Sequence, residues 1–222
     1  MAVSNEALVL ANTNYGALLL AMLPVGVELN ALLAVLVVEA SGQGIDPKTS
    51  KPVIRFEVHQ FFERYGHLNQ VAFDAHFMFD KLYKWKGHAF KVAQGTAFIP
   101  LHVPTGGQAA EWLALQTAME LDPSSAGPAI ESTSFGAGQI MGFHYKRVGY
   151  DTPFDMMRAA YNQEEQIHML IRLIESDIRL LTALRKKDWA TFARYYNGTG
   201  QIPTYSKLLG EAYGFASSLT TK

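Results

Sequence analysis

The feature that most constrains the fold is a stretch of ten residues, LNALLAVLVV (29–38), with a single polar side chain. A helix that is apolar on every side must be covered on every side, so this stretch predicts a buried central helix over residues 28–40. The segment VVEASGQG (37–44) continues it, with an ionisable carboxylate, Glu39, and then two glycines. A carboxylate where an apolar helix ends requires a physical or a functional reason.

Both the position and the surroundings of Glu39 favour its protonated form. The carboxyl end of a helix carries partial negative charge, which disfavours an ionised carboxylate. Apolar neighbours act in the same direction because they do not solvate the charge. Both effects raise the pKa, as a general acid working near neutral pH requires. The alternative is a glutamate that points to solvent before a glycine that ends the helix.

Composition places the chain among globular proteins. Hydrophobic residues make up 49% and charged residues 18% of its 222 residues, which excludes a disordered chain and allows a sizeable core. The net charge of −1 lacks the basic surplus typical of nucleic-acid binding. Residues 48–91 carry eight Lys or Arg against four acids, which we interpret as a solvated surface of mixed charge. The chain has no cysteine, which excludes disulfides and thiol chemistry.

The first 47 residues are rich in apolar side chains but do not resemble a targeting segment. No Lys or Arg precedes Lys48, so the basic start of a signal peptide is missing. Polar residues and Pro24 interrupt the apolar stretches, so no span of ~20 apolar residues exists. We therefore expect two buried helices, over residues 14–23 and 28–40, and no insertion into a membrane.

Helix-start signals at regular spacing predict a mostly α-helical (α+β) single domain over residues 1–222. Thr105 with Gln108 resembles a capping box, as does Asn162 with Glu165, and Thr152 precedes a proline as a helix N-cap does. An apolar stripe predicts one long helix over residues 162–184, and Pro203 opens a last helix that ends near Gly214.

One segment departs from the helical pattern. In KPVIRFEVHQ (51–60), apolar and polar residues alternate, and this two-residue period predicts a small β element near residues 52–59. Its polar face would carry Arg55, Glu57 and His59. Glu57 then either lines a cleft or forms a structural ion pair with Arg55. The Glu-x-His spacing is not a recognised metal-ligand pattern and the seven histidines are scattered, so we predict no metal.

Two further segments have ordinary structural explanations when taken alone. STSFGAGQIMG (132–142) is rich in glycine, as ligand-binding turns are, but it matches no nucleotide-binding fingerprint. ARYYNGTG (193–200) contains an Asn-Gly pair that is typical of a helix end.

The order of these segments is more informative than any one of them. VEASGQGID, then KPVIRFEVHQFF, then STSFGAGQIMGFHYKRVGY, then DWATFARYYNG and YSKLLGEAY together resemble the N-acetylmuramidase domain family of phage endolysins and bacterial cell-wall hydrolases. That family belongs to the lysozyme-like superfamily, with goose-type lysozyme and soluble lytic transglycosylases. The resemblance extends from about residue 14 to about residue 215. It implies a lysozyme-like helical fold, and no separate cell-wall-binding module is evident.

The resemblance also implies roles for particular residues. Glu39 stands where the family has its catalytic acid, and Glu57 stands at an acidic position that we assign to the second carboxylate. The residues expected to line the sugar groove are Ser134, Gln139, Tyr196 and Asn197. Gly42 and Gly44 are expected to end the helix and to leave room beside it for a sugar chain.

The implied activity is hydrolysis of peptidoglycan at the β-1,4 bond between N-acetylmuramic acid and N-acetylglucosamine. The expected partner is the glycan strand, the expected state a monomer, and no cofactor is expected. Without a signal peptide, the enzyme would be made in the bacterial cytoplasm and act on the cell wall after release. Two alternatives stay open. One is a lytic transglycosylase that forms 1,6-anhydro ends, and the other is a non-catalytic wall-binding or virion structural protein.

Overall fold

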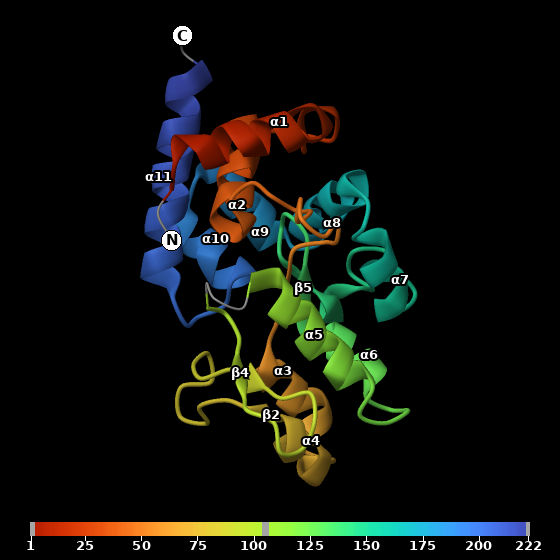
Figure 1. Ribbon diagram of the computed structural model, residues 1–222. Helices are drawn as coiled ribbons and strands as arrows, with labels where there is room; N and C mark the ends of the chain where they lie inside the picture. Colours follow the sequence, from red (N-terminus) through yellow and green to blue (C-terminus); the bar gives the residue numbers. More distant parts are fainter. Residues whose placement is uncertain (1–2, 104–106, 221–222) are drawn as a thin grey trace.

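Helix α2 (Leu29–Ala40) forms the centre of the helical part of the protein. The computed structural model describes residues 3–103 and 107–220. In it, α2 packs against α1 (Asn5–Ala21) and α11 (Ile202–Thr220), as Figure 1 shows. Every residue from 31 to 38 is buried, because a helix that is apolar all round is stable only when covered all round. The predicted central helix is confirmed.

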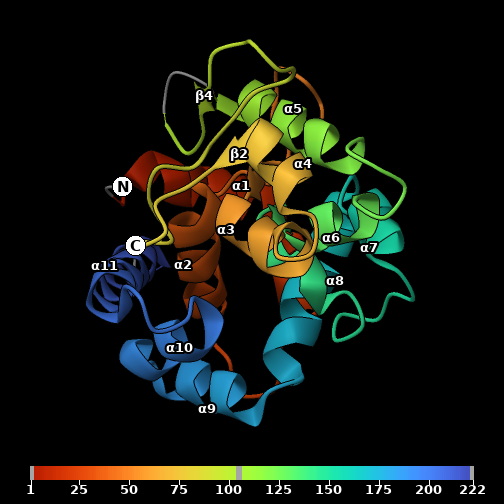
Figure 2. The same ribbon diagram turned by 90° about the horizontal axis from the view of Figure 1, so that it is seen from below.

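The other helices surround α2 or extend away from it. They are α3 (Val58–Phe61), α4 (Gln70–His76), α5 (Gly107–Met119), α6 (Ala126–Glu131), α7 (Pro153–Ala159), α8 (Gln163–Glu175), α9 (Ile178–Lys186) and α10 (Trp189–Tyr196). Figure 1 shows α1, α2 and α8 to α11 towards one end of the molecule and α3 and α4 at the other. Seen from below in Figure 2, α9, α10 and α11 lie on one side and α5, α6 and α7 on the other.

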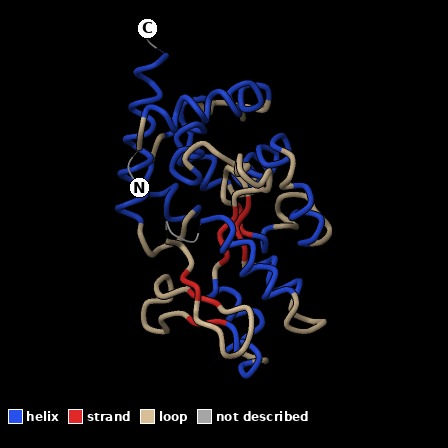
Figure 3. Tube along the Cα trace, viewed as in Figure 1, coloured by secondary structure: helices blue, strands red, loops and turns tan. Residues whose placement is uncertain are grey.

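Short strands form two small sheets, and Figure 3 shows how little of the chain they occupy. The first sheet has the antiparallel order β1 (Ile54–Phe56), β5 (Thr133–Phe135), β6 (Ile140–Met141). The second has the order β2 (Phe77–Met78), β3 (Ala89–Phe90), β4 (Ile99–Pro100). The mostly helical fold with a small β element near residues 52–59 is therefore confirmed, although the other strands were not predicted.

The predicted strand over residues 51–60 is too long. Strand β1 ends at Phe56, and Glu57 precedes the first residue of α3, where its carbonyl accepts from Gln60 N and Phe61 N. His59 therefore lies on a helical turn and not on a strand.

The predicted long helix over residues 162–184 is also wrong, because it is two helices. The helical conformation is interrupted between α8 and α9, where the Asp177 side chain accepts a hydrogen bond from Arg179 N and caps α9. Ile178, which fitted the apolar stripe, is 67% exposed. A capping aspartate inside an apolar periodicity was the signal that the stripe is interrupted.

The remaining helix predictions have mixed outcomes. The long α11 continues past Gly214 to Thr220, so the predicted end near Gly214 is wrong; Ala216 beyond it is still buried, which favours continuation. The predicted cap at Thr105 lies outside the described residues. Gln108 binds Ile54 instead: its Oε1 accepts from Ile54 N at 2.7 Å and its Nε2 donates to Ile54 O at 3.0 Å. Among the described helices, none combines the length and apolar character needed to cross a bilayer.

Candidate active site

The sheet β1-β5-β6 forms the floor of a groove. Arg55 pairs with Ser134 across β1 and β5, and Ser134 pairs with Met141 across β5 and β6. Side chains that stand opposite each other in neighbouring strands project to the same face of a sheet. All three line one hollow of about 350 Å³, which also contains Glu39 and Glu57.

This hollow continues into a second one of about 400 Å³. The residues that line both are Glu57, His59, Gln139, Met141, Tyr196 and Asn197. A larger hollow of about 620 Å³ lies beside α5, but Glu120 is the one acid in its lining. The groove over the sheet is therefore the candidate site, because it brings two carboxylates together. All six residues predicted as catalytic or sugar-binding lie along it.

Glu39 reaches the groove because α2 ends directly after it. Ser41 and Gly42 adopt left-handed conformations with φ of 52° and 73°, and Gly42 N donates to Leu36 O. In the groove, Asn197 Nδ2 donates to Glu39 Oε1 at 2.7 Å. Burial raises the pKa of Glu39 to about 7, although the hydrogen bond from Asn197 and the charge of Arg55 oppose the rise.

The two glycines after Glu39 have a different role from the expected one. Gly42 ends the helix as predicted, whereas Gly44 lies beyond the helix end, and neither glycine makes room for a ligand. A Cβ atom on Gly42 would lie 2.5 Å from Ala7 O of α1. A Cβ atom on Gly44 would collide with Gln166 of α8 and with the Tyr15 hydroxyl. The glycines therefore allow the segment after α2 to pack closely against the core, away from the groove.

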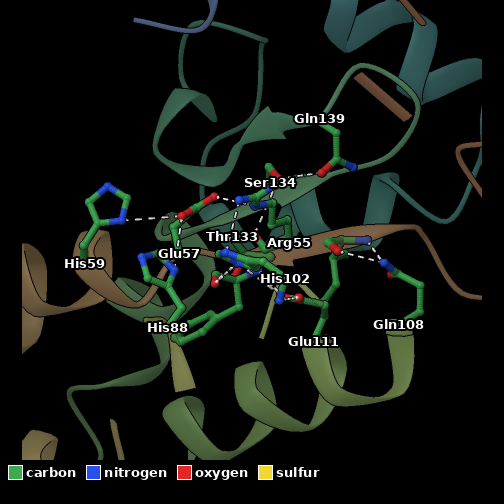
Figure 4. Close-up of polar contacts among 12 residues, drawn as sticks. Arg55, Glu57, His59, His88, His102, Gln108, Glu111, Thr133, Ser134 and Gln139 are labelled. Carbon is green, nitrogen blue, oxygen red and sulfur yellow. Dashed lines mark hydrogen bonds and ion pairs between the residues drawn. The ribbon is translucent and has the colours of Figure 1, made fainter. Parts of the chain in front are cut away.

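Glu57 is surrounded by cationic and imidazole groups, as Figure 4 shows. Arg55 Nε lies 2.9 Å from its Oε1, and His59 Nδ1 lies 3.4 Å from its Oε2. His88 Nδ1 is 3.5 Å from the same Oε2. Burial acts to raise the pKa of Glu57, but the hydrogen bond from His59, the charge of Arg55 and, where their rings are protonated, the charges of His102 and His88 outweigh it and lower the pKa to about 2. At a pH between these two pKa values, Glu57 is ionised while Glu39 keeps its proton.

The other predicted groove residues are largely bonded to the protein itself. Ser134 Oγ donates to Gln139 Oε1 at 2.8 Å, and Gln139 Nε2 donates to Gly136 O at 2.8 Å. Gln139 has a φ of 47°, in the left-handed region. The Tyr196 hydroxyl donates to Gly138 O at 2.7 Å. These bonds fix the turn between β5 and β6, so the residues shape the groove wall.

Several residues at the site were not predicted from the sequence. His88 and His102 stand beside Glu57, and Trp85 and Tyr205 line the hollow of Glu39. Trp85, His88 and His102 lie on loops that carry no motif to mark them, whereas Tyr205 lies on α11 and opens the segment YSKLLGEAY. Glu111 did carry a signal: it shares one face of α5 with the buried residues Ala114, Leu115 and Ala118.

Glu111 is a buried carboxylate that positions two parts of the site. Its Oε2 accepts from Phe56 N at 2.8 Å and its Oε1 accepts from His102 N at 3.0 Å. Burial raises the pKa of Glu111 to about 7, while these two backbone hydrogen bonds act to lower it. Glu111 therefore ties α5 to strand β1 and to the loop of His102.

Comparisons with known proteins give the fold and the family of this chain. The crystal structure of a Burkholderia AP3 phage endolysin is similar with a TM-score of 0.62 and 28% identity, over 96% of this chain and 71% of that chain. The match confirms the expected lysozyme-like fold. A search of curated proteins found no match. A family model described as N-acetylmuramidase matches residues 28–216. Since that match spans both carboxylates and the groove between them, the chain belongs to the N-acetylmuramidase family.

Proposed function

We propose that this chain is a muramidase that hydrolyses the β-1,4 bond between N-acetylmuramic acid and N-acetylglucosamine in peptidoglycan. Membership of the N-acetylmuramidase family supports the broader class, a glycosidase that cleaves peptidoglycan. One observation carries the proposal. Two carboxylates in one groove have pKa values displaced in opposite directions, Glu39 to about 7 and Glu57 to about 2. Such a pair supplies an acid and an anion at the same pH.

Glu39 is the proposed general acid. Asn197 occupies Oε1 as a donor, so the proton of the neutral acid belongs on Oε2. From there it is transferred to the glycosidic oxygen as the bond to the leaving sugar breaks. A water then bonds to the sugar carbon that carried the leaving group, and its proton returns to the Glu39 carboxylate. A pKa near 7 keeps a large share of Glu39 protonated near neutral pH and still allows the proton to leave.

Glu57 is proposed to stabilise the positive charge that develops on the sugar ring. A carboxylate with a pKa of about 2 is a weak base near neutral pH, because efficient general bases have a pKa close to the working pH. The same low pKa guarantees a full negative charge. Arg55 and His59 hold the carboxylate in one orientation, so the anion is placed before the substrate arrives.

The groove is proposed to hold the glycan strand along Ser134, Gln139, Tyr196 and Asn197, which all line it. Trp85 and Tyr205 line the hollow that contains Glu39 and offer aromatic faces for sugar rings. We propose the glycan strand as the partner of a monomeric enzyme. Similarity to a phage endolysin supports synthesis in a bacterial cytoplasm and action on the cell wall.

A second candidate is a lytic transglycosylase. It shares the step at Glu39 but closes a 1,6-anhydro ring with the substrate's own hydroxyl and needs no activated water. The weak basicity of Glu57 favours this alternative, because Glu57 is poorly suited to deprotonate a water.

Digestion of purified peptidoglycan followed by mass spectrometry tests both candidates. The control is a digestion with Glu39→Gln, which keeps an oxygen to accept the hydrogen bond from Asn197 but has no proton of suitable acidity. Soluble fragments with reducing N-acetylmuramic acid ends support the muramidase. Fragments one water lighter assign the transglycosylase reaction instead. Binding to the wall with no fragments beyond those of this control would contradict both and favour a non-catalytic protein.

A further inference from the structure

We propose that Glu57, His88 and His102 form a binding site for a divalent transition-metal cation such as Zn²⁺, and that the cation competes with Arg55 for this site. The sequence predicts no metal here, because the three residues lie in separate segments with no ligand spacing. The structure brings one potential ligand atom of each within 4.8 Å of the others. Figure 4 shows the three side chains grouped around Arg55.

His88 presents a lone pair with no hydrogen-bond donor. Its Nε2 lies 2.7 Å from Lys84 O, and a carbonyl only accepts, so Nε2 carries the hydrogen. In the neutral ring, Nδ1 then carries a lone pair that faces Glu57 Oε2 at 3.5 Å. Nδ1 is buried and has no hydrogen-bond partner among the described residues. A nitrogen lone pair and a carboxylate oxygen repel each other unless a proton or a metal cation lies between them, and a buried polar atom without a partner is costly.

His102 has the same tautomer and the same orientation. Its Nε2 lies 3.0 Å from Phe56 O and therefore carries the hydrogen. Its Nδ1 lies 3.1 Å from Arg55 Nη2, and a guanidinium only donates, so Nδ1 presents a lone pair. In both histidines a backbone carbonyl holds the other ring nitrogen. This is how metal-binding imidazoles are usually oriented.

The backbone of His102 is also held in an unusual conformation. Its φ of 61° is in the left-handed region, which is sparsely populated by residues with a side chain. The hydrogen bond from His102 N to Glu111 Oε1 maintains that conformation. Strained backbone of this kind is more common at functional sites than elsewhere.

The ligand set and its spacing fit zinc. Two imidazoles and one carboxylate are a known zinc ligand set, with bonds of about 2.0–2.2 Å. In a tetrahedral site two such ligands lie roughly 3.4 Å apart. The 3.5 Å between His88 Nδ1 and Glu57 Oε2 matches this value.

Arg55 occupies the place that the cation would take. It contacts two of the three proposed ligands, Glu57 through Nε at 2.9 Å and His102 through Nη2 at 3.1 Å. Its side chain is 48% exposed, so it can turn into solvent without leaving a buried charge. The two cations exclude each other, because both need the same lone pairs. Metal binding would neutralise the negative charge of Glu57, so Zn²⁺ would inhibit the hydrolysis; this consequence, unlike binding itself, rests on the proposed function.

Calorimetric titration of the full chain with ZnCl₂ tests the site. We expect the wild type to bind one equivalent. His88→Gln and His102→Gln should each weaken binding by at least about tenfold, because even the loss of a residue that only hydrogen-bonds a metal ligand has an effect of that size. Arg55→Met should tighten binding, because it removes the competing cation. The matched control is His67→Gln, since His67 forms an exposed His–carboxylate pair with Glu63 outside the groove. Its affinity should equal that of the wild type.

Thermal unfolding with and without Zn²⁺ gives a second measurement on the same variants. A ligand that binds the folded state raises the unfolding temperature. Zn²⁺ should therefore raise the unfolding temperature of the wild type and leave that of both histidine variants unchanged. Circular dichroism spectra of the two variants check that they are folded. Zn²⁺ binding that survives in His88→Gln and His102→Gln, or that is absent from both the wild type and Arg55→Met, would overturn the proposal. An inactive wild type that still binds Zn²⁺ through these histidines would contradict the proposed function and leave the metal site standing.

Discussion

Asn197 Nδ2 donates a hydrogen bond to Glu39 Oε1 at 2.7 Å, across 158 positions of sequence. The bond joins the end of α10 to the end of α2, the two helix ends that border the groove. A donor to a carboxylate favours the ionised form, so this bond opposes the rise in the pKa of Glu39 that burial causes.

We therefore expect the rate of the wild type to fall as pH rises through about 7, where Glu39 loses its proton. Asn197→Ala removes a bond that lowers the pKa, so the pKa rises further and the alkaline limb moves to higher pH. Turnover should also fall by about 10- to 100-fold, because the acid is no longer held in one orientation. A pH–rate profile on soluble glycan fragments measures both effects.

The control for this variant is Asn162→Ala. Asn162 caps α8 through its side chain, far in sequence from both carboxylates, and its loss costs about 1 kcal/mol of stability. It should lower the unfolding temperature without moving the alkaline limb. If the pH–rate profile of Asn197→Ala overlaid that of the wild type, Asn197 would have no influence on the pKa of Glu39.

The environment of Glu57 gives a second prediction. Glu57→Gln removes the negative charge but keeps the shape, so turnover should fall by about 100- to 1,000-fold, the effect of losing one placed electrostatic group. The matched control is Glu63→Gln, because Glu63, like Glu57, pairs with one basic side chain and a histidine, but on the surface. Equal activities of these two variants would contradict the role of Glu57.

The same substitution changes how stability depends on pH. The pKa of Glu57 is lowered from 4.5 to about 2 in the folded protein, so the carboxylate contributes stability above pH 4.5 and loses it as pH falls towards 2. Glu57→Gln should therefore show a smaller loss of stability between pH 4.5 and 2 than the wild type. Urea unfolding at several pH values measures the difference.

How much of this protein was predictable depends on how local each signal is. The burial of α2 followed from its own ten apolar residues, because a helix without a polar face has one stable environment. The caps of α7 and α8 at Thr152 and Asn162 were equally local, since the capping side chain and its backbone partners lie within three residues.

Features that depend on distant partners were not predictable in this way. Strand β5 has three residues, and its pairing with β1 joins Ser134 to Arg55, 79 positions away. His88 and His102 reach Glu57 only because the sheet β2-β3-β4 folds beside β1, and no local periodicity encodes that packing. The roles of Glu39 and Glu57 were predicted from the order of several segments along the chain, because no single motif assigned a role to either residue.

Glu111 gives a prediction about stability. Both of its oxygens accept from backbone N–H groups, of Phe56 and of His102. Glu111→Gln replaces one acceptor with an amino group, which leaves one buried N–H facing another donor. We expect a loss of about 1–3 kcal/mol in the free energy of unfolding, measured by urea denaturation. Unchanged stability would mean that the loop of His102 does not depend on Glu111.

Two glycine substitutions should have opposite effects on stability. A Cβ atom on Gly44 would lie 2.8 Å from Ala137 N and would collide with Gln166 and Tyr15. Those two side chains also bind Gly44 itself: Gly44 N donates to the Tyr15 hydroxyl at 2.8 Å, and Gln166 Nε2 donates to Gly44 O at 3.1 Å. Gly44→Ala must break this arrangement, and overpacking of this kind costs about 1–3 kcal/mol or more.

Gly214 is the matched control for Gly44. It lies inside α11, and a Cβ atom there would meet nothing within 4 Å. Gly214→Ala should stabilise the protein by roughly 0.5–1 kcal/mol, because alanine loses less backbone entropy in a helix. Thermal unfolding of the two variants should therefore shift in opposite directions from the wild type. A Gly44→Ala protein as stable as the wild type would show that the segment after Glu39 has room for a side chain, as a glycan-facing position would require.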